Sequence, residues 1–362
     1  MQIVQIATGL DEKSGGPYFF CKEILQELRT SGFQVRTFVF GGLGPIDSRY
    51  DEHALNIRAN RNGFFSIPRI RQLMALRTAN LVIFHGFYLF SFFWVLLWTK
   101  NRIAVIPHGS ISEYQHRNSK FRKILFRKIC YILDYKKKIK FYVASEQELQ
   151  DTLTHFSNNI STSLGLWVAN SDLSQIRDSS NYQKNICVIS RLHPIKNIEI
   201  LLASFDHLRK IEDLDLRLFV AGEGEDQYIK SLQKKVLNLG LNPYVKFLGH
   251  LNDIQKNILW NESDLLCQVS FYENFGQVVA ESVMRGVPVI VSKNLGISSI
   301  IESTQTGIVV DPNDFQGITN AILHGLENYS QLRFNCIQNR FIFSKEHVAK
   351  RWIRQIELDC SL

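Results

Sequence analysis

The sequence predicts an α/β protein with two halves, each built on a parallel sheet. The chain opens with a strand, a glycine-containing loop, a helix and a second strand, at residues 2–7, 8–17, 18–29 and 33–40. This order is the start of a βαβ unit. A second set of apolar strands begins at residue 186, after a stretch rich in Ser, Asn and Asp. The 362 residues are enough for two to three domains, each with its own core.

The composition is that of a globular protein. Hydrophobic residues make up 45% of the chain and charged residues 21%, which excludes a disordered protein. The net charge of +8 suits anionic substrates or an anionic membrane surface and does not choose between them. The six cysteines show neither a CxxC pattern nor metal-ligand spacing, and the N-terminus lacks the features of a signal peptide, so we expect a reducing cytoplasm.

Two strands of the first half, at residues 81–84 and 103–106, are each followed by a His-Gly pair. In an open parallel sheet, ligands collect at the carboxyl ends of the strands. The residues that we expect to face one crevice are Gly15, Gly16, His85 and His108.

Residues 84–98 are strongly apolar, but these 15 residues fall short of the ~20 that span a bilayer. We expect a buried or interfacial helix there. Residues 120–140 are rich in Lys and Arg, and their apolar residues recur at three- and four-residue steps. This spacing predicts an amphipathic basic helix, which either rests on anionic lipid or is the solvated face of an ordinary helix.

A strand at residues 141–144 precedes a helix start at which Ser145 and Glu148 have the spacing of a capping box. After the polar stretch, the expected strands of the second half are at residues 186–189, 216–221, 245–248, 265–269, 287–291 and 306–310. Two α/β halves joined by a linker predict a cleft between domains, which is a common place for a small-molecule site.

The loop at 270–275 and the helix at 276–285 organise the second half. Glu273 lies in the loop, and Glu281 lies about two turns into the helix. The positive end of the helix and its free N–H groups form a place for a phosphate. The residues expected to offer those groups are Asn274, Phe275 and Gly276.

Glu273 and Glu281, with Asn-Phe-Gly after the first, resemble the signature of family 4 retaining glycosyltransferases, which have the GT-B fold. The resemblance implies two Rossmann-like parallel-sheet domains that face a central cleft. The implied parts are an acceptor-side domain at residues 1–165, a linker at 166–183, a nucleotide-sugar-binding domain at 184–344, and a C-terminal helix at 345–362 that packs back on the first domain.

Arg191 and Lys196 lie in one loop after the strand at 186–189, and two cations at a strand end suit a diphosphate. Their stretch resembles the Gly-Arg-Leu…Lys-Gly motif of the family, with Ser190 and Asn197 in place of the glycines. These replacements leave the geometry of the loop open. Residues 220–224, Val-Ala-Gly-Glu-Gly, resemble the Ala-Gly-x-Gly turn of the family near the nucleotide.

In the first half, Pro107-His108-Gly109 and the later Ser145-Glu146-x-Glu148 resemble landmarks of the family members that build bacterial polysaccharide and lipopolysaccharide.

A DxD motif, which in other glycosyltransferases holds Mg²⁺ or Mn²⁺ on a diphosphate, occurs formally as Asp213-Leu-Asp215. It comes before the strand at 216–221, at the amino end and away from the crevice. We therefore expect a metal-independent enzyme without a cofactor.

The resemblance implies a retaining glycosyltransferase that moves a sugar from a nucleotide-diphosphate donor, with UDP-sugar as the default. The implied acceptor is a hydroxyl of a lipid-linked or growing bacterial surface glycan such as O-antigen, capsule or exopolysaccharide. The catalytic candidates are Glu273 and His108. The expected substrate contacts are Arg191, Lys196 and the N–H groups of 274–276 for the diphosphate and Glu281 for the ribose. Gly15 and Gly16 are further substrate-binding candidates at the crevice, and His85 is a candidate acceptor contact.

Two alternatives stay open, namely a nucleotide-sugar epimerase of the same fold and a non-catalytic nucleotide-sugar-binding protein. We expect the enzyme to be peripheral on the inner face of the cytoplasmic membrane, with an anionic lipid surface as partner and no nucleic acid.

Overall fold

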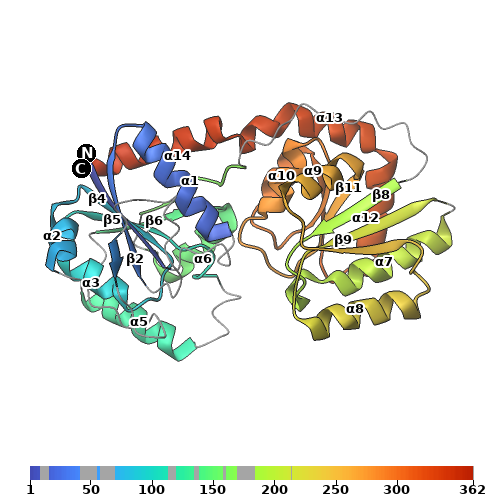
Figure 1. The fold of residues 1–362 in the computed structure, drawn as a ribbon, viewed down its shortest axis with the longest axis horizontal. Coiled ribbons are helices and arrows are strands. Elements are labelled where there is room, and N and C mark those ends of the chain that lie inside the picture. Colours follow the sequence, from blue (N-terminus) through green and yellow to red (C-terminus); the bar gives the residue numbers. More distant parts are fainter. Residues whose placement is uncertain are drawn as a thin grey trace. The chain divides into compact units, whose positions relative to one another are not determined.

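A computed structural model of the chain describes residues 1–8, 16–40, 55–57, 70–112, 120–133, 138–157, 160–168, 184–212 and 214–361. The chain forms two compact units (Figure 1). Unit 1 comprises Met1–Leu166 and Val348–Leu362, and unit 2 comprises Trp167–His347.

Unit 1 is built on a parallel sheet whose described strands have the order β3-β2-β1-β4-β5-β6-β7. The strands are β1 (Gln2–Thr8), β2 (Gln34–Phe40), β3 (Leu55–Ile57), β4 (Leu81–His85), β5 (Arg102–Ile106), β6 (Ile139–Val143) and β7 (Ile160–Ser163). The helices are α1 (Gly16–Thr30), α2 (Ile70–Thr78), α3 (Ser91–Trp98), α5 (Lys120–Ile132), α6 (Glu146–His155) and the C-terminal α14 (Lys345–Cys360).

Alternate strand residues of unit 1 point to opposite faces of the sheet. On one face, Val4, Phe84 and Val105 share a core with α2, α3 and α5. The other face packs against α1 and α14. The buried Gln5 and His85 lie on that second face, since they are offset by one residue from Val4 and Phe84.

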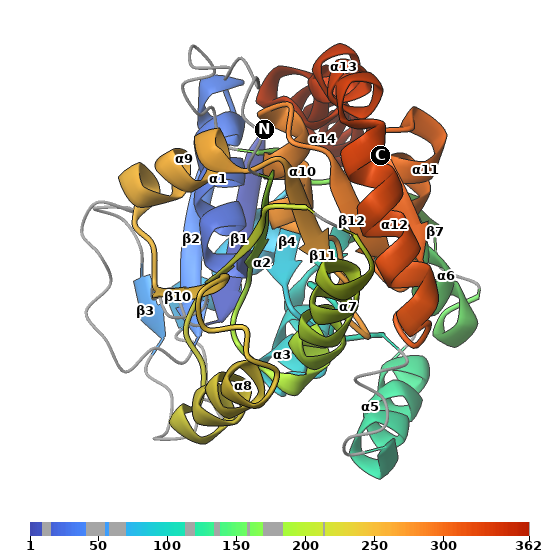
Figure 2. The ribbon, with the colours of Figure 1, turned by 90° about the vertical axis from the view of Figure 1, so that its right-hand side faces the viewer.

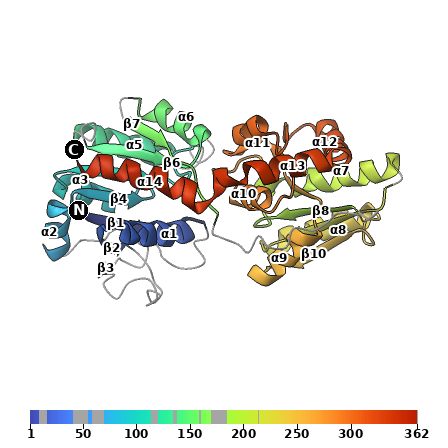
Figure 3. The same cartoon turned by 90° about the horizontal axis from the view of Figure 1, so that it is seen from above.

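The C-terminal helix α14 lies along unit 1 (Figure 3). Apolar and charged side-chain contacts anchor it there. The ring of Trp352 packs on Phe20 with centroids 4.9 Å apart, and its Nε1–H donates to the backbone oxygen of Gly165 at 3.0 Å. The buried Asp359 accepts hydrogen bonds from three groups of the sheet. They are Arg102 Nη1 at 2.8 Å, Lys140 Nζ at 3.3 Å and the hydroxyl of Tyr142.

The apolar stretch at 84–98 is mostly core. Phe84 and His85 end strand β4, and α3 buries Phe92, Val95 and Leu96 while leaving Leu97 and Trp98 exposed. Among the described residues, no helix is both long and apolar enough to span a membrane.

The prediction of one amphipathic helix over residues 120–140 is wrong beyond Ile132, where α5 ends. Lys138 precedes β6, and its Nζ donates to the backbone oxygen of Thr99 at 2.9 Å. Lys140 lies within β6 and is buried beside Asp359, so it is not available to a surface. Lys136 and Lys137 lie outside the described residues.

Unit 2 has a second parallel sheet, with the order β10-β9-β8-β11-β12-β13. The strands are β8 (Lys184–Ile189), β9 (Leu216–Ala221), β10 (Val245–Gly249), β11 (Leu265–Gln268), β12 (Val289–Ser292) and β13 (Gly307–Val310). The α-helices are α7 (Ile198–Ile211), α8 (Asp226–Asn238), α9 (Asp253–Glu262), α10 (Gln277–Met284), α11 (Ser298–Thr304), α12 (Phe315–Glu327) and α13 (Tyr329–Asn339), with 3₁₀ turns η3 (Pro194–Lys196) and η4 (Arg340–Phe343).

Helices α7, α8 and α12 share one apolar core with the sheet of unit 2, and α7 and α12 lie side by side (Figure 2). Trp167 and Val168, which the sequence assigns to the linker, are buried in this unit. The N–H of Val168 donates to the backbone oxygen of Phe343 at 3.0 Å, and the backbone oxygen of Trp167 accepts from Gln277 Nε2 at 2.9 Å. Residues 169–183 lie outside the described part of the chain.

Candidate functional site

Loops at the carboxyl ends of β8 and β11 are joined in unit 2. The N–H of Phe271 donates to the backbone oxygen of Ile195 at 2.8 Å. The loop after β11 also pairs with the loop after β12. Glu273 forms a parallel bridge with Leu295, and the N–H of Gly296 donates to the backbone oxygen of Glu273 at 3.0 Å. The backbone around Glu273 is therefore fixed from both sides.

Lys196 and Glu273 form a direct ion pair across these two loops. The Lys196 side chain is 13% exposed and that of Glu273 is 29% exposed, so both are largely shielded but reachable from solvent. Two of the residues predicted from the sequence are thus brought together. Arg191 lies in the same loop as Lys196 and is exposed.

Asn197 shows how this loop forms without the glycine of the family motif. Its backbone is left-handed, with φ 56°, a conformation that asparagine adopts more readily than most residues. Its Nδ2 donates to the backbone oxygens of Val269 at 3.2 Å and Pro312 at 2.7 Å. One buried amide therefore ties together the loops that follow β8, β11 and β13.

The glycines of Val220-Ala-Gly-Glu-Gly224 have a steric role. A Cβ on Gly222 would collide with the backbone oxygen of Ser190, and one on Gly224 would collide with that of Leu192. The two loops are held by hydrogen bonds from Ser190 N–H to Ala221 O at 3.0 Å and from Leu192 N–H to Glu223 O at 2.6 Å. The turn resembling Ala-Gly-x-Gly therefore packs against the loop of Arg191.

The start of α10 has the geometry of an anion site. Gly276 is its N-cap with φ 102°, and a Cβ there would lie 3.1 Å from Ile297 Cγ2. In the first turn, the N–H of Val279 donates to the backbone oxygen of Gly276 at 2.9 Å, whereas the N–H groups of the two residues before it have no partner four residues back within the helix. Phe275 is buried with its ring 6.5 Å from that of Phe343, so its side chain belongs to the core, whereas Asn274 is half-buried.

Glu281, in the second turn of α10, is paired with Lys256 of α9. The Lys256 side chain is 23% exposed and that of Glu281 is 16% exposed. Sequence reasoning missed Lys256, because the two residues lie on different helices and their spacing carries no signal. Glu273 and Glu281 thus each have a lysine partner.

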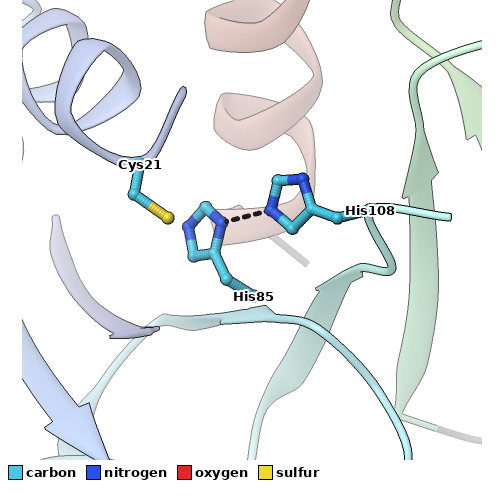
Figure 4. A group of neighbouring side chains, drawn as sticks. All are labelled: Cys21, His85 and His108. Carbon is cyan, nitrogen blue, oxygen red and sulfur yellow. Dashed lines mark hydrogen bonds between the residues drawn. The ribbon is translucent and has the colours of Figure 1, made fainter. Parts of the chain in front are cut away.

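In unit 1, His85 and His108 lie together at the ends of β4 and β5 (Figure 4). His85 Nδ1 and His108 Nε2 are 3.0 Å apart, and the two ring planes are inclined by only 15°, with centroids separated by 5.3 Å. His85 is buried, and its Nε2 lies 3.0 Å from Gln5 Nε2. Both ring nitrogens of His85 therefore have protein partners, whereas His108 is only half-buried.

Burial sets the charge of these two histidines. It lowers the pKa of His108 from 6.5 to about 4. Burial, reinforced by the neighbouring His108, holds the pKa of His85 well below its usual value. Both rings are neutral at pH 7.

The backbone of His108 is held by a distant carboxylate. His108 and Gly109 both have positive φ, at 51° and 79°. The buried Glu148 accepts a hydrogen bond from the N–H of Gly109 at 2.6 Å and from that of Ala144 at 2.8 Å, while Ser145 Oγ caps the N–H of Glu148 at 3.1 Å. The two landmarks of the first half therefore meet, and Glu148 supports the turn that carries His108.

Four residues that the sequence singled out remain. Gly15 and Asp213 lie outside the described residues, and Gly16 begins α1. Asp215 precedes the amino end of β9, where its backbone oxygen accepts from the N–H of Lys184 at 2.9 Å. It is thus at the opposite end of the sheet from the loops that carry Lys196 and Glu273.

Comparisons with known proteins find similarity to glycosyltransferases. Residues 171–341 match the family model described as glycosyl transferases group 1. An uncharacterized glycosyltransferase of Methanocaldococcus jannaschii is 32% identical over 133 residues, which are 36% of this chain and 33% of that protein. The O-antigen chain mannosyltransferase B of Escherichia coli is 28% identical over 144 residues, or 39% of this chain and 36% of that protein. The chain spans about a third of the length of these curated relatives.

A crystal structure of HepE from Anabaena in complex with UDP matches this chain with a TM-score of 0.77 at 17% identity. The match covers 99% of this chain and 100% of that one. The chain has the GT-B fold. The group 1 match lies within the second unit of this GT-B chain and contains Arg191, Lys196, Glu273 and Glu281.

Proposed function

We propose that the protein is a retaining glycosyltransferase that transfers a sugar from a UDP-sugar to a hydroxyl of a lipid-linked or growing bacterial surface glycan. The observation that carries the proposal is the Lys196–Glu273 pair beside the start of α10, in the segment that matches the group 1 family. Within one set of hydrogen-bonded loops, the cations and the helix N-terminus suit the diphosphate of such a donor, and the carboxylate suits the hydroxyls of its sugar.

In this proposal, Lys196, the exposed Arg191 and the N–H groups at 274–276 bind the diphosphate. Negative charge grows on the diphosphate as the sugar leaves, so these groups stabilise the transition state more than the ground state. A diphosphate that binds Lys196 competes with Glu273 for it. The Glu273 carboxylate then becomes available to accept hydrogen bonds from sugar hydroxyls.

Glu281 binds the ribose hydroxyls in this proposal, and the ion pair with Lys256 orients its carboxylate. His108 of unit 1 binds a sugar hydroxyl as a neutral ring. No dedicated base is assigned, because the departing phosphate oxygen itself takes the acceptor proton.

We propose that the reaction needs no metal. Lys196, Arg191 and the end of α10 supply positive charge for the diphosphate, and Asp215 lies at the other end of the sheet. Removing divalent cations tests this directly.

The proposed lipid-linked acceptor calls for a membrane-facing surface, and α5 offers one. Its buried Phe126 and Cys130 face the core of unit 1. The opposite side exposes three large apolar residues at helical spacing, Phe121 at 79%, Leu125 at 50% and Ile132 at 78%. Exposed Arg122 and Lys128 flank them. An apolar stripe flanked by cations suits the surface of an anionic bilayer, and we propose the inner face of the cytoplasmic membrane.

A panel of nucleotide-diphosphate sugars tests the proposal, first by thermal stabilisation and then by product analysis. A ligand at 100 times its Kd adds about 2.7 kcal/mol to the free energy of unfolding. We expect one UDP-sugar to stabilise the chain and to be transferred with the anomeric configuration retained, as read by NMR. Stabilisation without transfer or hydrolysis would indicate a binding protein instead, and conversion of the free donor into its epimer would indicate an epimerase.

A further inference from the structure

A chain of hydrogen bonds runs through the interior of unit 1 to His108. Gln5 Nε2 is 3.0 Å from the backbone oxygen of Cys21 and 3.0 Å from His85 Nε2. His85 Nδ1 is in turn 3.0 Å from His108 Nε2. Gln5 and His85 are 1% and 3% exposed, so water does not compete for these bonds.

The donor and the acceptor of each hydrogen bond follow from the first bond of the series, in which the backbone oxygen of Cys21 accepts. A backbone carbonyl can only accept, so the Gln5 atom facing Cys21 is the amide nitrogen. That nitrogen has two hydrogens and no acceptor capacity, so its second hydrogen goes to His85 Nε2. A neutral His85 that accepts at Nε2 carries its proton on Nδ1. It therefore donates to His108 Nε2, and a neutral His108 must carry its own proton on Nδ1.

From this chain we infer that Gln5 and His85 are positioning residues that hold His108 in the neutral tautomer with the proton on Nδ1. His108 then offers a hydrogen-bond donor, and not an acceptor, to an oxygen of the ligand that it contacts. The tautomer assignment stands without the proposed function, whereas its effect on turnover rests on that function.

Two features make His108 sensitive to its neighbour. Its backbone is fixed by the Gly109 N–H bond to Glu148, so the ring has little freedom to move away from His85. Among the described residues, Nδ1 of His108 has no protein partner, and the half-buried ring keeps contact with solvent. Nδ1 of His108, which carries the proton because of these hydrogen bonds, is thus the nitrogen that can contact a ligand.

Cys21, His85 and His108 also bring one potential ligand atom each to within 4.8 Å of one another (Figure 4). A metal there would require a thiolate and two lone pairs that point at the ion. Burial raises the pKa of the Cys21 thiol, which favours the protonated form. The hydrogen-bond chain also places a proton on His85 Nδ1, between the two rings. The arrangement therefore favours a proton-bearing pair over a metal centre.

The test is a long-range ¹H–¹⁵N spectrum of the full chain labelled with ¹⁵N-histidine at pH 7.5, with His108 and His85 assigned from His108→Asn and His85→Phe. We expect the proton on Nδ1 and the lone pair on Nε2 for both rings in the wild type. A His108 ring protonated on Nε2 would overturn the inference. If one of the two variants does not fold, the other still identifies one ring of the pair, and the protonated nitrogen of that ring tests the inference.

Gln5→Met keeps the volume and removes the amide, so His85 is no longer required to accept at Nε2. We expect both rings to become mixtures of tautomers, and kcat/KM for the identified donor to fall about tenfold, the equivalent of about one hydrogen bond. Gln72→Met, which alters a buried glutamine on α2 at the other face of the sheet, should change neither. An unchanged His108 tautomer in folded Gln5→Met would refute the role of Gln5.

A Zn²⁺ titration distinguishes the proton-bearing histidine pair from a metal site. Stoichiometric binding of added Zn²⁺ that is lost in Cys21→Ser would overturn the inference, whereas no binding supports it. If the NMR spectrum shows the predicted tautomers but the protein turns over no nucleotide-sugar, the proposed function is refuted. The positioning role of Gln5 and His85 then still stands.

Discussion

Removal of the Lys196 ammonium tests the proposed diphosphate site most directly. Lys196→Ala deletes a cation that is 13% exposed and paired with Glu273. The remaining carboxylate is 29% exposed and thus partly solvated, so the free energy of unfolding should fall by no more than about 1 kcal/mol. The fold should remain intact while donor use is impaired.

The size of the functional effect follows from the lost contact. A charge-assisted hydrogen bond contributes about 1.5–3 kcal/mol, and each 1.36 kcal/mol of transition-state stabilisation is a factor of about ten in rate. We expect kcat/KM for the UDP-sugar to fall about ten- to a hundredfold in Lys196→Ala. Arg191→Ala should also reduce it, toward the lower end of that range, because Arg191 is exposed to solvent.

Release of UDP, followed with the donor identified from the panel, is the assay. Lys210→Ala is the matched control, since Lys210 pairs with Asp206 on the surface of α7 and is 66% exposed. It removes the same charge from the same unit and should leave kcat/KM unchanged. Near-wild-type values in both Lys196→Ala and Arg191→Ala would refute the assignment of the diphosphate to this loop.

Three further predictions concern metal, membrane and pH. Activity should survive EDTA and the Asp215→Ala change; complete loss with EDTA, restored by Mn²⁺ and mimicked by Asp215→Ala, would contradict metal independence. Wild-type protein should float with anionic vesicles at low salt and less at high salt, since exposed charges are screened within about 8–10 Å at physiological ionic strength, and Phe121→Ser with Ile132→Ser should abolish flotation. Failure of the wild type to float at low salt would exclude the membrane proposal. The folded chain binds fewer protons at His108 than the unfolded chain between pH 6.5 and about 4, so stability is lost as the pH falls through that range, by at most about 2 kcal/mol at pH 5. Urea unfolding at pH 7.5 and 5 should show a smaller loss in His108→Asn, and equal losses would refute the depressed pKa.

Much of the fold could be predicted because it depends on local patterns. Apolar strand runs and strand-end glycines indicated both sheets, and the loop of Glu273 followed from a strand and a helix start. Pairs between distant elements could not be predicted. Lys140 looked like part of a basic helix, but its neighbours in β6 make it a strand residue whose charge meets Asp359, 219 positions later. No sequence spacing encodes such a partner, because it is fixed only when α14 packs on the sheet.

The same limit applies to the candidate site. The carboxylate Glu281 could be named from its motif, but its partner Lys256 could not, since the two meet only after α9 and α10 pack. His85 could be named from its place at a strand end. Its role depends on Gln5, which reads in the sequence as an unremarkable residue within an apolar strand.

Asn197 is the case in which a departure from the family motif has a structural answer. The motif has a glycine there, and only a residue that tolerates positive φ can replace it without strain. Asparagine meets that requirement at φ 56° and adds two buried hydrogen bonds that a glycine cannot form. Any other side chain would have to bear the left-handed conformation and would leave the backbone oxygens of Val269 and Pro312 without this donor. The replacement therefore preserves the position of Lys196, the residue just before it, which is the property that the proposed binding of a diphosphate requires.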